Sequence, residues 1–98
     1  MADISIQQTR ERLHQVQLVD VREDSEVAQG RIPGARHIPL GQLGGRLAEL
    51  DRQQPVVAIC RSGNRSARAA ELLTAAGFTC DNMVGGMLAW QAAGLPTA

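Results

Sequence analysis

The fold of this chain is decided by residues 55–77, which read PVVAICRSGNRSARAAELLTAAG. After Pro55, residues 56–59 form an apolar run of strand length without polar alternation, which predicts a central strand covered on both faces. From Arg65 the chain becomes rich in alanine and leucine at helical spacing, and Gly77 is suited to end that helix in the left-handed conformation. The sequence therefore predicts a strand, a short loop and a helix in direct succession.

Strands and helices alternate along the rest of the chain, an order that predicts an α/β fold with a parallel sheet. We expect a single domain over residues 1–98, because this length allows one core. Ser5 and Gln8 have the spacing of a capping box, which predicts a helix from about residue 6 to residue 14. The other expected elements are strands at residues 16–21, 35–38 and 78–84, a helix with Leu43, Leu47 and Leu50 at helical spacing, and a last helix at residues 87–93.

The loop from Cys60 to Ser66 carries the chemistry that the sequence indicates. Loops at the carboxyl ends of parallel strands form the ligand sites of open sheets. None of residues 61–66 is proline, so six successive backbone N–H groups can curl around one centre, and Gly63 and Asn64 tolerate positive φ. The start of the following helix adds its positive end at the same place. This pattern predicts an anion cradle around the thiol.

Arg61 and Arg65 place two positive charges near Cys60. Cations and N–H donors favour a thiolate over a thiol, so we expect the pKa of Cys60 to fall below its ordinary value of ~8.5. The same cradle would hold a persulfide. The residues therefore predict nucleophilic catalysis in two halves, in which Cys60 attacks the outer sulfur of an anionic donor oriented by Arg61 and an acceptor then takes that sulfur.

The sequence resembles the rhodanese family in three blocks that together span nearly the whole chain. They are similar to the family's active-site loop, to its Asp-Val-Arg signature and Gly-His-Ile-Pro-Gly-Ala turn, and to its carboxyl-terminal signature. In this chain the blocks are Cys60 to Arg65 with Ser66; Asp20-Val-Arg22 with Glu26 and Gly30-Arg-Ile-Pro-Gly-Ala35; and Gly85-Gly86 with Trp90 and Gly94-Leu-Pro96. Arg31 stands where the family usually has His, so we assign position 31 no catalytic role.

The resemblance implies a rhodanese-like three-layer sandwich, in which helices flank a mostly parallel five-stranded sheet. It also implies a thiosulfate sulfurtransferase that carries sulfane sulfur as a persulfide on Cys60 and passes it to a thiophilic acceptor such as cyanide or a thiol. No metal or organic cofactor is implied. The residues expected to bind the substrate are those of the loop, namely Arg61, Ser62, Gly63, Asn64, Arg65 and Ser66.

Three other functions stay open beside this one. A persulfide carrier in a protein sulfur relay would use the same loop with a protein as acceptor. A binding module without activity is disfavoured by the intact Cys60 and the two loop arginines. An arsenate reductase or phosphatase is disfavoured because four residues separate Cys60 from Arg65, a shorter loop than the one with which cysteine phosphatases encircle a phosphate.

Composition narrows the setting and the partners. Ten acidic and ten basic residues balance, so no overall field favours nucleic acid or an anionic membrane. All the basic residues are arginine, which excludes chemistry based on a Schiff-base or phosphate-loop lysine. Two cysteines without a signal peptide predict the cytoplasm, and no uncharged stretch is long enough for a membrane span. The expected partners are a small anionic sulfur donor and a thiol or protein acceptor.

Several residues near the site also have structural interpretations. Asp20 and Arg22 are expected to form an ion pair, with Glu26 as a further partner of Arg22. Arg65 can organise the loop carbonyls or contact the substrate. Ser66 can contact the sulfur or cap the helix.

The remaining cysteine and the histidines are expected to play no part in the chemistry. Cys80 lies in an apolar pattern without a nearby arginine, which predicts an inert core residue. Met87 and Trp90 stand at helical spacing and are expected to pack on the sheet. His14 and His37 lack companions with metal-ligand spacing, which predicts surface positions.

Overall fold

All five strands of the protein join one parallel sheet. The computed structural model describes residues 1–98. The strands are β1 (Asp3–Ile4), β2 (Gln17–Asp20), β3 (Arg36–His37), β4 (Val56–Ile59) and β5 (Cys80–Met83). Their order across the sheet is β1-β5-β4-β2-β3, and every neighbouring pair is parallel. The central strand is therefore β4, as its apolar run predicted.

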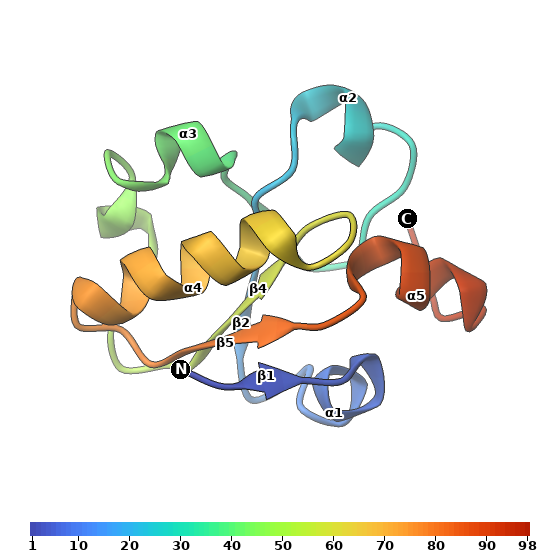
Figure 1. The fold of residues 1–98 in the computed structure, drawn as a ribbon, viewed down its shortest axis with the longest axis horizontal. Coiled ribbons are helices and arrows are strands. Elements are labelled where there is room, and N and C mark those ends of the chain that lie inside the picture. The colour runs from blue at the N-terminus through green and yellow to red at the C-terminus, as the bar shows by residue number, and fades with distance from the viewer.

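Helices cover both faces of the sheet and complete three layers (Figure 1). One face packs against α3 (Leu40–Leu43) and α4 (Asn64–Ala75), and the other packs against α1 (Ile6–Glu11) and α5 (Gly86–Ala92). The short helix α2 (Asp24–Val27) follows β2, and a 3-10 turn, η1 (Leu47–Glu49), follows α3. This arrangement confirms the predicted α/β sandwich with a five-stranded parallel sheet.

Alternate residues of β4 belong to two separate apolar cores. Val56 and Ala58 face the core that contains Leu73 of α4, whereas Val57 and Ile59 face the core that contains Trp90 of α5. All four strand residues are buried. A strand covered on both faces has no exposed side and so no reason for polar alternation. Met87 also belongs to the second core, and its position with Trp90 confirms the predicted packing of these residues on the sheet.

Local sequence signals place several element ends correctly. The strand β4 covers the four predicted residues, and α4 ends before Gly77, whose φ is 96°. Ser5 and Gln8 make both hydrogen bonds of the capping box at the start of α1, although this helix ends at Glu11 and not near residue 14. The longest helix, α4, has 12 residues, and no helix is both long and apolar enough to cross a membrane.

Other expectations were wrong. The leucines at positions 43, 47 and 50 do not share one helix. The helix α3 ends at Leu43, Gly44 and Gly45 follow it, and the next helical segment is the separate 3-10 turn η1. The strand β5 begins at Cys80, two residues later than predicted. Neither β1 nor α2 was predicted, since elements of two and four residues are too short to show a period.

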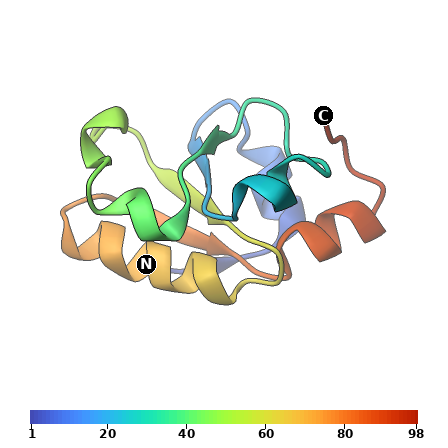
Figure 2. The ribbon, with the colours of Figure 1, turned by 90° about the horizontal axis from the view of Figure 1, so that it is seen from above.

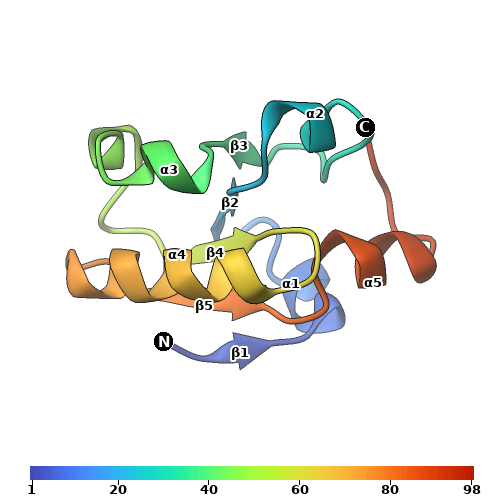
Figure 3. The ribbon, with the colours of Figure 1, turned by 45° about the horizontal axis from the view of Figure 1, so that its top comes forward.

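The carboxyl ends of the strands meet where the loop after β4 lies. Figure 3 shows the arrowheads of β1, β4 and β5 pointing toward the same end of the sheet, next to α5. Figure 2 shows the same loop beside the start of α5 from above. The backbone N–H groups of Met87 and Leu88 donate to the carbonyls of Cys60 and Arg61, at 2.8 and 3.0 Å. The start of α5 is thus fastened to the predicted active-site loop.

Candidate active site

The loop from Cys60 to Gly63 turns the chain from the end of β4 into the start of α4. Gly63 is the N-cap of α4 and has a φ of 112°, which an L side chain rarely adopts. A Cβ at this position would also lie 3.5 Å from the backbone nitrogen of Gly85. Asn64 was expected to tolerate positive φ, but it is the first helical residue, so Gly63 alone provides the left-handed turn.

Gly86 allows α5 to begin directly against this loop. Its φ is 58°, and a Cβ there would lie 2.5 Å from the carbonyl oxygens of Cys60 and Arg61. No other residue fits between these two backbones without displacing one of them. The sequence predicted Gly85-Gly86 as a strand break, but this close approach is a second role that a turn signal does not reveal.

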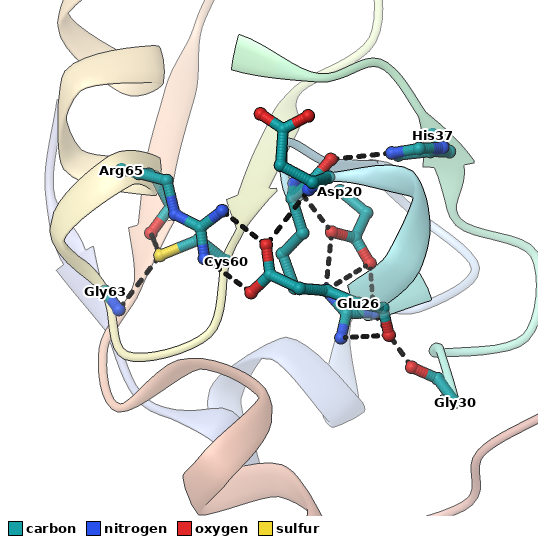
Figure 4. Close-up of polar contacts among 10 residues, drawn as sticks. Asp20, Glu26, Gly30, His37, Cys60, Gly63 and Arg65 are labelled. Atoms are coloured by element: carbon teal, nitrogen blue, oxygen red, sulfur yellow. Dashed lines mark hydrogen bonds and ion pairs between the residues drawn. The ribbon is translucent and has the colours of Figure 1, made fainter. Parts of the chain in front are cut away.

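The sulfur of Cys60 lies among hydrogen-bonding groups of its own loop (Figure 4). The Gly63 N–H donates to Sγ at 3.0 Å, and Ser66 Oγ lies 3.2 Å from Sγ. Burial raises the pKa of the Cys60 thiol, but hydrogen bonds from the Ser66 hydroxyl and from the backbone of Ser66, Gly63 and Ser62 outweigh burial and leave the pKa below its ordinary value. This lowered pKa agrees with the sequence prediction, with hydrogen bonds as its principal cause.

Ser66 contacts the sulfur and does not cap the helix. It is the third helical residue of α4, because Gly63 occupies the N-cap position. Its side chain is fully buried, with Oγ between Cys60 Sγ and the side chain of Asn82, to which it donates at 2.5 Å. Asn82 lies on β5, so this strand contributes to the site from behind the loop.

Arg65 is held by a carboxylate from α2. Its guanidinium donates to both oxygens of Glu26, at 2.6 and 2.7 Å, as Figure 4 shows. The hydrogen bond from Arg65 is the main reason that the pKa of Glu26 falls to about 2. The same bond raises the pKa of Arg65. The sequence suggested that Arg65 organises the loop carbonyls or contacts the substrate. It did not indicate this pairing with Glu26, which fixes the guanidinium beside the loop.

Asp20 and Arg22 form the buried ion pair that the sequence predicted. Arg22 Nη2 lies 2.7 Å from Asp20 Oδ2, and Nε lies 2.9 Å from Oδ1. Arg22 also donates to the main-chain carbonyls of Glu26 and Gly30. Glu26 is a further partner of Arg22, as predicted, but through its main-chain carbonyl, because its carboxylate bonds Arg65.

The two histidines differ in exposure. His14 is exposed, as predicted. His37 is half-buried on β3, and its Nε2 donates to the main-chain carbonyl of Arg22 at 2.6 Å. The expectation of a surface position was therefore wrong for His37, which supports the backbone of the chain after β2.

Comparison with known proteins shows which family has this arrangement. The profile of the rhodanese-like domain matches residues 5–93. The chain belongs to the rhodanese-like family. It is 47% identical over 74 residues to YtwF of Bacillus subtilis, named as a candidate sulfurtransferase, with 76% of this chain and 72% of YtwF covered. It is 42% identical over 82 residues to a sulfurtransferase of Allochromatium vinosum, with 83% of this chain and 77% of that protein covered.

A solved rhodanese-related structure agrees over the full length. The crystal structure of a rhodanese-related protein from Thermoplasma volcanium matches this chain with a TM-score of 0.96 and 31% identity, covering 100% of this chain and 98% of that one. The whole rhodanese-like architecture is therefore shared, including the strands and helices around the loop. This agreement confirms the family that the three sequence blocks indicated.

A small cavity lies at the mouth of the loop in this rhodanese-like domain. It has a volume of about 150 Å³, and its lining comes from the chain after β2, from α2, from the loop and from α5. Arg61 lines it and is exposed, as are Ser62 and Asn64. The other lining residues are Arg22, Glu26, Gln29, Met87, Leu88 and Gln91. Of the predicted loop residues, Gly63 and Ser66 are therefore buried beside the sulfur, Arg65 is half-buried, and Arg61 alone lines the cavity.

Cys80 lies in the core of the rhodanese-like domain, as predicted. It is 1% exposed and belongs to the apolar core under α4. Burial is the main cause that raises the pKa of its thiol to about 12, with the nearby charge of Asp81 as a second cause. The pKa values of the two thiols are therefore shifted in opposite directions, downward for Cys60 and upward for Cys80.

Proposed function

We propose that this rhodanese-like domain is a sulfurtransferase that carries sulfane sulfur as a persulfide on Cys60. The observation that carries this proposal is the position of Cys60 Sγ, which is buried yet hydrogen-bonded to Gly63 and Ser66 so that its pKa is lowered. A thiolate is the nucleophilic form of cysteine. The relatives named as sulfurtransferases support the same chemistry.

In the first half-reaction, the Cys60 thiolate attacks the outer sulfur of an anionic donor such as thiosulfate. A bond forms between Sγ and that sulfur, the sulfur–sulfur bond of the donor breaks, and sulfite leaves with its electron pair. Arg61 is exposed at the mouth of the loop, where its positive charge attracts and orients the donor.

The persulfide is an anion, and we assign its binding to the loop from Arg61 to Ser66. Backbone N–H groups at the start of α4 favour negative charge at this place. Ser66 contacts the inner sulfur, and Gly63 shapes the turn that brings its own N–H to the sulfur. Arg65 adds a charge at a position that Glu26 holds.

In the second half-reaction, an acceptor attacks the outer sulfur of the persulfide. Cyanide takes this sulfur as thiocyanate, and the Cys60 thiolate leaves with the electron pair of the broken sulfur–sulfur bond. A thiolate acceptor becomes a persulfide in the same way. Because the donor product leaves before the acceptor reacts, the kinetics should be ping-pong.

The activity is tested by thiocyanate formation from thiosulfate and cyanide. Cys60→Ser should abolish the activity, whereas Cys80→Ser serves as the matched control and should keep it. Parallel double-reciprocal lines are the expected pattern when both substrates are varied. Full activity in Cys60→Ser would remove Cys60 from the mechanism and with it the proposal.

Two exposed apolar side chains favour a second candidate, a persulfide carrier in a protein sulfur relay. Val84 and Leu88 are 45% and 47% exposed, and both lie at the loop, since Leu88 N–H donates to Arg61 and the Val84 Cα lies 3.9 Å from the Cβ position of Gly63. Exposed apolar side chains beside a site suit a protein partner. A stable Cys60 persulfide with cyanide turnover far below roughly 10 s⁻¹ would favour the carrier, and turnover at or above that rate would favour the enzyme.

A further inference from the structure

Cys60 stands at the end of a chain of four hydrogen-bonded side chains that crosses to the edge of the sheet. Cys60 Sγ lies 3.2 Å from Ser66 Oγ, Ser66 Oγ lies 2.5 Å from Asn82 Oδ1, and Asn82 Nδ2 lies 3.2 Å from Asp3 Oδ1. Ser66 and Asn82 are buried, at 0% and 4% exposure. The chain links the loop to β5 and β1, where Asp3 and Asn82 are paired in the sheet.

The few protons on these four side chains limit the directions in which their hydrogen bonds can run. An ionised carboxylate only accepts hydrogen bonds, so Asp3 orients the Asn82 amide with its NH₂ group toward β1 and its oxygen toward Ser66. A serine hydroxyl has a single proton. When Ser66 donates that proton to Asn82, its oxygen presents lone pairs to Cys60. This arrangement suits a protonated thiol, which can donate to Ser66. A thiolate gains the hydrogen bond of the Ser66 hydroxyl only when that hydroxyl turns away from Asn82.

We propose that Asn82 is a positioning residue that competes with Cys60 for the hydroxyl proton of Ser66, and that Asp3 orients Asn82 for this competition. Formation of the thiolate then requires the Ser66 hydroxyl to turn toward the sulfur. That turn leaves the buried oxygen of Asn82 without its donor, which is unfavourable in a buried site. Asn82 therefore holds back the thiolate that the rest of the loop favours.

The other charged groups around Cys60 stay constant when Asn82 is replaced by a neutral residue. They are Arg61 in the loop, Arg65 on α4 and Glu26 on α2, together with the Asp20–Arg22 pair after β2. No hydrogen bond or ion pair of the loop joins the sulfur to an ionisable side chain of α5 or β5. A change in Cys60 acidity on substitution of Asn82 would consequently report on the Ser66 proton.

This inference rests on the proposed function, because the acidity of Cys60 matters only if Cys60 is the nucleophile. Its test, however, does not measure sulfur transfer. The rate of alkylation by iodoacetamide, measured against pH in a Cys80→Ala background, gives the pKa of Cys60. Asn82→Val removes the competing oxygen and leaves the Ser66 proton free for the thiolate. The pKa of Cys60 should fall by roughly half to one unit.

Two further variants connect the effect to the serine proton. In a Ser66→Ala background, Asn82→Val should no longer change the pKa of Cys60. Thr9→Val is the matched control, because Thr9 is also a buried polar residue but donates to the Ser5 carbonyl on α1, away from the loop. It should leave the alkylation profile unchanged.

An unchanged or raised pKa in folded Asn82→Val would overturn the inference, and so would an equal effect of Asn82→Val with and without Ser66. If Asn82→Val does not fold, Asp3→Ala tests the same point at an exposed residue, because the freed amide can then turn its NH₂ group toward Ser66. A smaller fall in pKa is expected, with Asp81→Ala as the control for loss of a carboxylate, because Asp81 lies on the neighbouring strand β5 and accepts from the Ala2 N–H. A similar fall in both variants would contradict the role of Asp3. Failure of thiosulfate transfer in all of these proteins would bear on the proposed function alone.

Discussion

Cys60 depends on a few hydrogen bonds for its acidity, because burial by itself would raise the pKa of its thiol. Ser66 supplies the largest of the opposing contributions when its hydroxyl turns from Asn82 to the sulfur. Ser66→Ala should therefore raise the pKa of Cys60 by roughly one unit and slow alkylation at neutral pH by up to about tenfold. The measurement is the rate of alkylation against pH, and a profile identical to that of the unmodified protein would contradict this role of the hydroxyl.

Glu26 provides a second prediction at the scale of single residues. Its pKa is lowered to about 2, chiefly by Arg65, so the pair stabilises the fold fully above the ordinary carboxyl pKa of 4.5 and loses this contribution as the pH falls toward 2. Glu26→Gln should be less stable than the unmodified protein at neutral pH, and the difference should shrink in that acidic window. Urea unfolding midpoints across this range measure the effect.

Glu71→Gln is the control for the acid experiment, because Glu71 is an exposed residue of α4 without an ion pair. It should leave the pH dependence of stability unchanged. A stability difference between Glu26→Gln and the unmodified protein that stays constant from neutral to acidic pH would be inconsistent with a pair that dissociates on protonation of Glu26.

Among the elements, the contact between α5 and the loop after β4 depends on Gly86. Gly86→Ala would place a Cβ 2.5 Å from the carbonyl oxygens of Cys60 and Arg61 at a φ of 58°. We expect a loss of stability of roughly 1–3 kcal/mol and, because the loop must move, a marked loss of sulfur transfer. Thermal unfolding and thiocyanate formation measure the two effects.

Gly41→Ala is the matched control for this prediction. Gly41 lies in α3, and a Cβ there would meet no atom within 4 Å. A helical glycine replaced by alanine without strain is expected to be neutral or slightly stabilising. Equal effects of Gly41→Ala and Gly86→Ala would show that the close approach at Gly86 does not matter.

The elements also show where sequence-based prediction succeeds and where it does not. The strand β4 and helix α4 were predicted well because their signals are local, namely an unbroken apolar run, an alanine-rich helix and Gly77. The helix expected through Leu43, Leu47 and Leu50 was wrong because leucine spacing does not register the interruption at Gly44 and Gly45. The strand β1 exists through its pairing with β5, so two residues alone could not indicate it.

The same distinction applies to the site. Cys60 and the residues up to Ser66 are adjacent in the sequence, and their loop could be recognised directly. Glu26, Asn82 and Gly86 reach this loop from α2, β5 and the start of α5. Their contribution depends on which elements the parallel sheet brings to its carboxyl edge. A pattern in one segment cannot report a contact whose partner lies elsewhere in the chain.

For the whole molecule, stability depends on two thin cores on either side of the sheet. Trp90 is the largest fully buried side chain, and it joins α5 to β4 in one core while its Nε1 donates to the Pro96 carbonyl. Trp90→Ala should cost about 3–5 kcal/mol, a large share of the roughly 5–15 kcal/mol by which domains are stable. Trp90 is the single tryptophan, so its replacement removes the tryptophan fluorescence signal, and unfolding should be followed by circular dichroism.

Leu88 on the same helix is the control, since its side chain is 47% exposed. Leu88→Ala should change the free energy of unfolding by less than about 0.5 kcal/mol. If the two substitutions destabilised the protein equally, the core under α5 would not be the support that the packing indicates.

The central claim is that Cys60 carries sulfur as a persulfide, and the intact mass of the protein after exposure to thiosulfate tests it most directly. The unmodified protein and Cys80→Ala should each gain one sulfur atom, Cys60→Ala should gain none, and cyanide should remove the added sulfur. The absence of any added sulfur on the unmodified protein across neutral pH, or an equal gain by Cys60→Ala, would contradict the claim.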